Sequence, residues 1–388
     1  MSEYQYYEFQ ALDRPLSQEQ MAHLRGVSSR AQITPHSFVN EYNWGSFKGN
    51  PDQWMERYFD AFIYFANWGS RRFMLRLPTK LLDRKTVESY CEGESLSCWQ
   101  KDDHTILSFD AELEDFERGE ESISLASLIS IRADLMRGDY CALYLGWLLA
   151  VQCKEVEEKE IEPPVPSGLG HRHGSLDCLA AFLAIDPDLI AAAAESSADE
   201  QLPVLSKTQI GEWVRSLPSA DKDAIVTRLI DGGDLHISAE VRQRAICEIA
   251  GKGRSRERQR RTAAEILARG ETIAAERKKR DAEERAKEKA RRERAAADAR
   301  KKRLESLAGK ENHLWSTVDK LIATKQPRRY DEAVSILKDL HDLAVLKGKS
   351  GEFKSRMAAL ERANAAKGTL IERFRKANLL EYEREEAS

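Results

Sequence analysis

The sequence lacks the short motifs by which common nucleotide-hydrolysing and ester-hydrolysing enzymes are recognised. It contains neither a Gly-x-x-x-x-Gly-Lys-Ser/Thr phosphate loop nor a Gly-x-Ser-x-Gly turn, which would expose a nucleophilic serine. The tripeptide Gly348-Lys349-Ser350 is only a fragment of a phosphate loop, since the leading glycine is missing. These absences argue against P-loop nucleotide hydrolysis and against serine-hydrolase chemistry, and we predict no catalytic residue.

Cysteine and long apolar runs are also scarce. The six cysteines are widely spread and include no Cys-x-x-Cys pair, which is typical of reduced thiols in a cytoplasmic protein. The first ten residues have no basic start and no apolar run, so they do not resemble a secretory signal. The longest apolar stretch, residues 140–151, is shorter than the roughly 20 residues of a membrane span and predicts a buried helix. We therefore expect a cytoplasmic protein with no membrane partner.

Charge is abundant, and its two signs are separated along the chain. Charged residues make up 32% of the sequence, yet the formal net charge is only −4. Residues 1–251 contain 24 basic and 41 acidic residues, whereas residues 252–303 contain 21 basic and 10 acidic residues. A basic segment of this kind indicates contact with a polyanion or with an acidic protein surface.

Residues 1–155 are predicted to form a mixed α/β domain. Residues 72–77 alternate basic and apolar side chains, as the two faces of a strand do. Residues 96–100 and 105–109 flank a short polar turn and predict a hairpin. Because helical patterns also occur in this part, the expected fold class of the whole chain is α+β.

One stretch of this domain is predicted to be helical because of its first residues. Asn50, Pro51 and Gln53 are the residue types of an N-cap, a first-turn proline and an N3 glutamine. Apolar residues then recur at helical spacing over a wide arc, which is typical of a buried helix. The predicted helix includes Trp54, Tyr58, Phe62 and Phe65.

The remaining sequence is predicted to be helical and to fall into three further parts. Residues 156–251 begin with an acidic, proline-rich linker and are expected to form a helical bundle. Residues 252–308 are expected to form a long charged helix. Residues 309–388 carry apolar stripes on short helices and predict a small domain of helical hairpins.

The long charged helix is predicted to extend from Arg254 to Leu307. No glycine or proline interrupts residues 271–308, a length on the order of 57 Å at 1.5 Å per residue. Acidic residues often precede basic ones by four positions, as Glu283 precedes Lys287 and Glu288 precedes Arg292, and each such pair stabilises an exposed helix by about 0.2–0.5 kcal/mol. The apolar stripe is thin. A single solvent-exposed helix, a helix laid along a partner and a coiled coil therefore stay open.

Basic residues cluster at three places in this segment and are the predicted contact residues. Phosphate contacts are made by such side chains and carry no base-sequence information. One alternative is docking onto an acidic protein surface, including that of residues 1–251, and another is a solvated helix whose charges only keep the protein soluble. The predicted contact residues are Lys252, Arg254, Arg256, Arg258, Arg260, Arg261, Arg277, Lys278, Lys279, Arg280, Arg300, Lys301, Lys302 and Arg303.

Two further patterns could bind metal. His171 and His173 stand one residue apart in a glycine loop and could ligate zinc, but no distant cluster completes the set of ligands. Residues 112–121 carry several carboxylates, which two-metal nucleases also use, although so dense a run is more typical of a solvated loop. We therefore expect no metal and no other cofactor.

Several stretches together resemble an uncharacterised family of bacterial proteins, and they span most of the chain. They are YYEFQALDRPL, ITPHSFVNEYNWGSFKG, ERYFDAFIYFANWGSRRFMLRLP, DPDLIAAAAE and ATKQPRRYDEAVSILKDLHDLA. The last stretch is also similar to the C-terminal ends of bacterial proteins that carry a SWIM-type zinc finger. That resemblance implies a connection with nucleic-acid biology, but the Cys-x-Cys and Cys-x-His pattern of the finger itself is absent.

These patterns predict a non-enzymatic scaffold or accessory subunit of a nucleic-acid-associated bacterial assembly. It would engage a protein partner and use the basic helix to contact phosphate groups or an acidic surface. The alternative is a nuclease or hydrolase hidden in the N-terminal domain. That alternative predicts a concave pocket in residues 1–155, lined by charged groups with shifted pKa values. The oligomeric state stays open.

Overall fold

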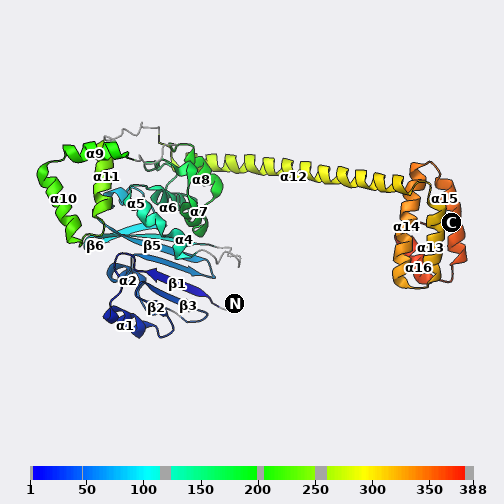
Figure 1. Cartoon of the computed structure of the whole chain (residues 1–388), viewed down its shortest axis with the longest axis horizontal. Helices are drawn as coiled ribbons and strands as arrows, with labels where there is room; N and C mark the ends of the chain where they lie inside the picture. Colours follow the sequence, from blue (N-terminus) through cyan, green and yellow to red (C-terminus); the bar gives the residue numbers. More distant parts are fainter. Residues whose placement is uncertain (1–2, 46, 114–123, 199–204, 250–259, 381–388) are drawn as a thin grey trace. The chain divides into compact units, whose positions relative to one another are not determined.

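The computed structural model of the chain describes residues 3–45, 47–113, 124–198, 205–249 and 260–380. The chain divides into two compact units, which we call the N-terminal unit (residues 1–278) and the C-terminal unit (residues 279–388). The N-terminal unit holds a seven-stranded sheet with helices, and the described part of the C-terminal unit is helical (Figure 1). The predicted α+β class is therefore confirmed.

The sheet consists of β1 (Gln5–Gln10), β2 (Gln32–Thr34), β3 (Ser37–Tyr42), β4 (Ala61–Ala66), β5 (Ser70–Pro78), β6 (Leu96–Lys101) and β7 (His104–Glu112). All neighbours pair antiparallel, in the order β2-β3-β1-β4-β5-β7-β6. The strand predicted at residues 72–77 is confirmed as part of β5. The predicted hairpin is confirmed as β6 and β7.

The helix predicted from Asn50 onward is wrong after its first two turns. Helix α2 (Pro51–Arg57) begins as expected, because the backbone N–H of Gln53 donates a hydrogen bond to the Asn50 side chain. The next apolar run instead forms β4, which pairs with β1 and β5. A strand buried on both faces is apolar at nearly every position, so the same run also fits the wide face of a buried helix. Phe62 enters the core on one side of the sheet, and Ile63 enters the core on the other.

Helices cover both faces of the sheet (Figure 1). Helix α1 (Gln18–Val27) and α2 close an aromatic core that includes Phe9 and Trp54. The other face is covered by α4 (Leu125–Leu128), α5 (Ser130–Met136), α6 (Cys141–Gln152), α7 (Gly174–Phe182) and α8 (Pro187–Ala194), and α3 (Arg84–Glu88) lies at its margin. The predicted buried helix is confirmed as α6, in which every residue from Cys141 to Val151 is buried. Within the described residues, no helix has both the length and the apolar character that a membrane crossing requires.

Three more helices form a small group with a separate core. They are α9 (Lys207–Ser216), α10 (Ser219–Asp231) and α11 (Ile237–Ile249), and they meet around Trp213, Leu217 and Ala245. Polar contacts join this group to the sheet. The Lys80 ammonium lies 2.6 Å from the Asp234 carboxylate, and the side-chain amide of Gln243 donates to the carbonyl oxygen of Leu81. The loop between α10 and α11 is thereby held against the end of β5.

Helix α12 (Ala263–Leu307) is 45 residues long and unbroken, on the order of 67 Å at 1.5 Å per residue. A capping box starts it, as the N–H of Glu265 donates to Thr262 Oγ1 (3.3 Å) and the N–H of Thr262 donates to the Glu265 carboxylate (2.8 Å). The predicted start at Arg254 lies outside the described residues, but residues 260–262 are described and are not helical, so the helix begins later than the sequence predicts. The predicted end at Leu307 is confirmed.

The first turns of α12 are packed within the N-terminal unit. Ala263 and Ile266 are buried in the main core. Gly270 lies against α8, where a β-carbon would come within 3.3 Å of the α-carbon of Leu189. A glycine here therefore permits a close approach of the two helices, and it does not interrupt α12.

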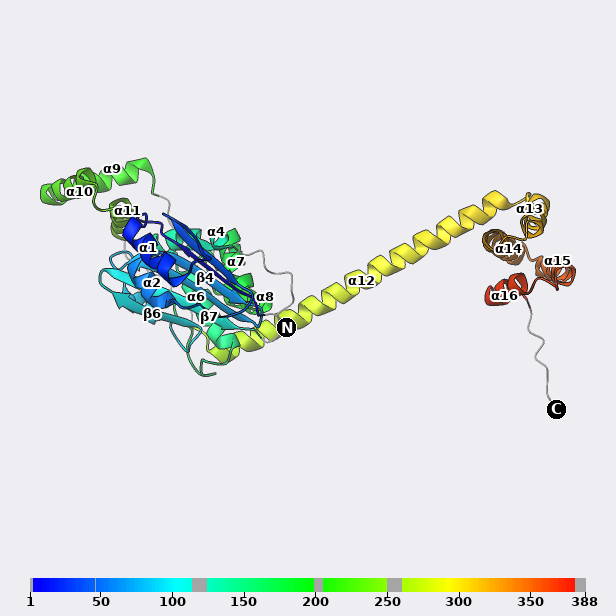
Figure 2. The same ribbon diagram turned by 90° about the horizontal axis from the view of Figure 1, so that it is seen from below.

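The C-terminal unit contains α13 (Glu311–Ala323), α14 (Pro327–Leu346), α15 (Ser350–Ala363) and α16 (Gly368–Lys376) (Figure 2). Their apolar stripes meet in one core, which includes Trp315, Leu337, Phe353 and Phe374. These are the short helices that the sequence predicts after Gly309, and a left-handed glycine at that position separates α12 from α13.

Candidate functional site

The predicted contact residues fall into three groups. Some are arginines paired with a buried carboxylate, which we call anchors; others are cations without a partner in the described part of the chain; the rest are not described. Lys252, Arg254, Arg256 and Arg258 lie outside the described residues. The others lie on α12 or immediately before it.

Arg261 is an anchor. Its guanidinium donates to both oxygens of the Glu162 carboxylate (3.1 and 3.0 Å) and to the carbonyl oxygens of Ala192 (2.7 Å) and Ala193 (3.2 Å). The Glu162 side chain is only 1% exposed, and it also accepts hydrogen bonds from the Tyr144 hydroxyl and from the Arg261 backbone N–H. Burial alone lowers the pKa of Arg261, but the bond to Glu162 outweighs it and raises that pKa. Arg261 therefore ties the start of α12 to the N-terminal unit.

Arg277 is a second anchor, about four turns further along. Its guanidinium makes a forked contact with the Asp188 carboxylate on α8 (2.9 and 2.7 Å), and the Asp188 side chain is 6% exposed. Between the two anchors, Arg269 forms an exposed forked pair with Glu195. Because a fork fixes orientation as well as distance, these pairs hold α12 along α8.

Two arginines anchor the other end of α12 to α14. Arg303 donates to Asp339 through Nε (3.1 Å) and Nη2 (2.6 Å). Arg300 forms ion pairs with both Asp339 and Asp342, the latter at 2.6 Å. The Asp339 side chain is 5% exposed, so these guanidiniums neutralise a carboxylate that has little access to water.

The other described members of the predicted contact set are exposed and unpaired. We call Lys278, Lys279, Arg280, Lys301 and Lys302 the free basic set. No carboxylate in the described part of the chain lies within ion-pair distance of any of them. Arg260, just before α12, is likewise exposed and unpaired. The sequence cannot distinguish these residues from the anchors, because Asp188 and Asp339 are remote in the chain.

The middle of α12 is open on all sides. From Ala275 to Ala299 every residue is exposed except Glu288, which is half-buried. Glu288 forms ion pairs with Arg291 (3.2 Å) and Arg292 (3.0 Å), and the second of these is an i,i+4 pair that the sequence predicts. Exposed alanines and local charge pairs such as these are typical of a helix that persists without an apolar partner.

Neither candidate metal pattern gathers ligands in the described residues. His171 closes the short 3₁₀ helix η1 (Leu169–His171), and Nε2 of His173 lies 2.9 Å from a carboxylate oxygen of Asp134. Among the residues that the structure describes, no three His, Cys, Asp or Glu side chains are placed to hold a metal ion. Glu112 accepts a hydrogen bond from Ser70, and the rest of the acidic run lies outside the described residues.

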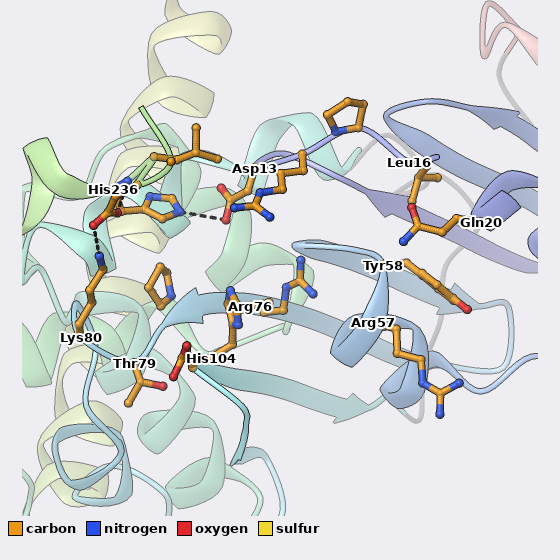
Figure 3. Close-up of a pocket in the computed structure, with 17 residues that line it drawn as sticks. Asp13, Leu16, Gln20, Arg57, Tyr58, Arg76, Thr79, Lys80, His104 and His236 are labelled. Atoms are coloured by element: carbon orange, nitrogen blue, oxygen red, sulfur yellow. Dashed lines mark hydrogen bonds and ion pairs between the residues drawn. The ribbon is translucent and has the colours of Figure 1, made fainter. Parts of the chain in front are cut away.

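A polar cleft of about 840 Å³ lies in the N-terminal unit (Figure 3). Five segments line it: the β1–α1 loop, the end of α2, the end of β5, the β6–β7 turn and the α10–α11 loop. The lining residues are Asp13, Arg14, Pro15, Leu16, Gln20, Arg57, Tyr58, Arg76, Pro78, Thr79, Lys80, Asp103, His104, Gly233, Asp234, Leu235 and His236.

Asp13 is a firmly held carboxylate of the cleft. It accepts a fork from Arg132 (2.9 and 2.6 Å), and Nε2 of His236 lies 2.9 Å from it. Burial alone would raise the pKa of Asp13, but these partners lower it well below its usual range. Asp13 and His236 are 223 positions apart, so no local pattern in the sequence indicates that they meet.

A second network stands at the same end of the cleft (Figure 3). Lys80 pairs with Asp234 (2.6 Å) and Glu240 (3.1 Å). Burial lowers the pKa of Lys80, but the bonds to these two carboxylates outweigh burial and raise that pKa. His104 differs, because burial and the nearby charge of Arg76 lower its pKa. The cleft thus holds a fixed carboxylate, a fixed ammonium and an imidazole whose pKa is lowered.

The charges of the cleft are not fully balanced. Arg76 is neutralised by Asp60, whose side chain is 1% exposed. Arg14 and Arg57 are both exposed on the lining, and neither has an ion-pair partner among the described carboxylates.

Neither a protein-family model nor a curated protein nor a solved structure matches this chain. The resemblance to the uncharacterised bacterial family and to the ends of SWIM-finger proteins therefore stays a prediction. The proposals below start from α12 and from the cleft.

Proposed function

We propose that the chain is a non-enzymatic accessory subunit that contacts the phosphate backbone of nucleic acid through α12. The observation that carries the proposal is the division of basic residues on this helix. The arginines at its two ends are used by buried aspartates, whereas the free basic set has no partner in the described part of the chain. Cations without an intramolecular partner are available to an external anion.

Part of the free basic set is also arranged for contact on one side. Lys279 and Lys301 are 22 residues apart, which is about six helical turns and about 33 Å, so both project from nearly the same face. Ala286, Ala290 and Ala297 lie on that face between them and are exposed. Duplex DNA repeats its backbone every 34 Å or so, which matches the spacing of the two basic groups.

The first prediction is that the chain binds duplex DNA without sequence preference and that the free basic set carries this binding. Reversing all five charges (K278E, K279E, R280E, K301E and K302E) should abolish binding at physiological salt. It should also reduce the slope of log affinity against log salt by about 4.5, because each of the five lost phosphate contacts removes about 0.9. Fluorescence anisotropy with a labelled duplex, titrated at several salt concentrations, measures both quantities.

A matched control separates this contact from general electrostatics. Lys320, Arg328 and Lys338 are exposed and unpaired within the described residues, and they lie on α13 and α14. The variant K320E, R328E and K338E should bind as the unmodified chain does, and it should be compared with K278E, K279E and R280E, which has the same charge change. Equal losses in the two triple variants would sink the proposal, as would no binding by the unmodified chain at low salt. Selective capture of an acidic protein in place of DNA would favour the acidic-partner alternative.

A further inference from the structure

The polar cleft of the N-terminal unit carries features that the proposed role of α12 does not use. Its volume of about 840 Å³ lies within the range of about 300–1,000 Å³ that is usual for small-molecule sites. Most of its charges are paired, but the guanidiniums of Arg14 and Arg57 and the exposed carboxylate of Asp103 have no ion-pair partner among the described residues. Two unneutralised guanidiniums on the lining make the cleft attractive to an anion.

The loop that bears Arg14 is fixed by a buried carboxylate. Asp60 accepts hydrogen bonds from the backbone N–H groups of Leu12 (2.7 Å) and Asp13 (2.9 Å), and its second oxygen accepts a fork from Arg76. The side chain of Asp13 is fixed in turn by Arg132. The backbone immediately before Arg14 is therefore ordered before any ligand binds, which reduces the loss of conformational entropy on binding.

The two ends of the cleft differ in chemistry. Figure 3 shows Arg57, Tyr58, Gln20 and Leu16 at one end, and His236, Lys80 and His104 toward the other. Near Arg57, the side-chain amide nitrogen of Gln20 is available as a donor, because the oxygen of that amide already accepts the N–H of Ser17. A guanidinium presents its N–H groups as a planar fork, which fits the oxygens of a phosphate.

We propose that this cleft binds a small ligand that carries a phosphate group, with Arg14 and Arg57 as its contacts. The rest of the ligand extends along the cleft toward the α10–α11 loop, whose residues Asp234 and His236 form part of the lining. That loop is held in place by the pairs of Lys80 with Asp234 and of His236 with Asp13. A ligand seated in the cleft therefore adds contacts to the loop and restrains it. This site is independent of α12 and of its contact with nucleic acid.

The test is calorimetric titration of the full chain with phenyl phosphate and with inorganic phosphate, at constant ionic strength in chloride. Both should bind, and Arg14→Ala and Arg57→Ala should each weaken binding by about tenfold or more, because each removes a charge-assisted hydrogen bond. Arg14→Lys should recover only part of the affinity, since an ammonium keeps the charge but lacks the fork. Arg30→Ala is the matched control, because Arg30 is exposed and unpaired among the described residues and lies outside the cleft lining.

Hydrogen exchange locates the ligand. Phenyl phosphate should slow amide exchange in residues 233–240, and it should have no such effect in the Arg14→Ala chain. Each Ala variant should keep the thermal midpoint of the unmodified protein, because exposed substitutions of this kind hardly change stability. The proposal is overturned if neither phosphate probe binds, if Arg30→Ala weakens binding as much as Arg14→Ala does, or if exchange in residues 233–240 is unaffected. Binding of citrate without binding of either phosphate would identify a carboxylate site and would equally overturn it.

Discussion

Replacing Arg261 with alanine should lower the free energy of unfolding of the N-terminal unit by about 3 kcal/mol. The substitution leaves the Glu162 carboxylate, which is 1% exposed, without its counter-charge, and removal of one partner from a buried pair typically costs about 3–5 kcal/mol. It also removes the donors to the carbonyl oxygens of Ala192 and Ala193. Urea unfolding followed by tryptophan fluorescence measures the change, since six of the seven tryptophans precede residue 279.

Two further variants, a conservative replacement and a neighbouring control, test this expectation. Arg261→Lys should recover part of the loss, because an ammonium keeps the charge but cannot reach both Glu162 oxygens and two carbonyl groups together. Arg260→Ala changes the neighbouring exposed arginine and should alter stability by no more than about 0.5 kcal/mol. A loss for Arg261→Ala as small as that for Arg260→Ala would show that Arg261 is not an anchor.

The second large effect is expected at the other end of α12. The double variant R300M and R303M removes both guanidiniums from Asp339, which is 5% exposed, and should destabilise the C-terminal unit by about 3 kcal/mol. Amide exchange in residues 327–346, which form α14, should accelerate accordingly, because Asp339 is in that helix.

The adjacent lysines provide the control for this pair. K301M and K302M remove the same number of charges from the same turn, but both side chains are exposed and unpaired within the described residues, so exchange in α14 should hardly change. Adding D339L to R300M and R303M should restore most of the stability, because no buried charge is then left without a partner. If the lysine variant accelerated exchange as much as the arginine variant, the distinction between anchors and free cations would fail.

The two ends of α12 show what the sequence can specify about a helix. Its continuity and its end at Leu307 are predictable, because no proline occurs within it and charge pairs support the helix along its length. The roles of its arginines are not predictable, since Arg277 and Lys278 look alike in sequence and differ only because Asp188 faces one of them. Long-range pairing therefore decides which side chains are left free for a partner.

The sheet and the cleft show where local patterns fail. The sequence of β4 is misread as helix because a strand buried on both faces lacks the alternation of polar and apolar residues. The helix start predicted at Asn50 is correct, but the helix that begins there, α2, ends before β4. The cleft is built from five separate segments, and its Asp13–His236 contact spans 223 positions. An enzyme hidden in the N-terminal domain stays a prediction. The charged cleft, which the α10–α11 loop completes, is the place to look for it.

The central claim is that the exposed middle of α12 is an unbroken helix that needs no apolar partner. Spin labels placed at Ala282 and Ala299 through non-natural residues, which spare the six cysteines, would test it in the full chain by pulsed dipolar spectroscopy. Seventeen residues of α-helix span about 26 Å, so we expect one narrow distance distribution near that value, broadened only by the label linkers. A broad distribution, or a main distance far from that of a straight helix, would contradict the account.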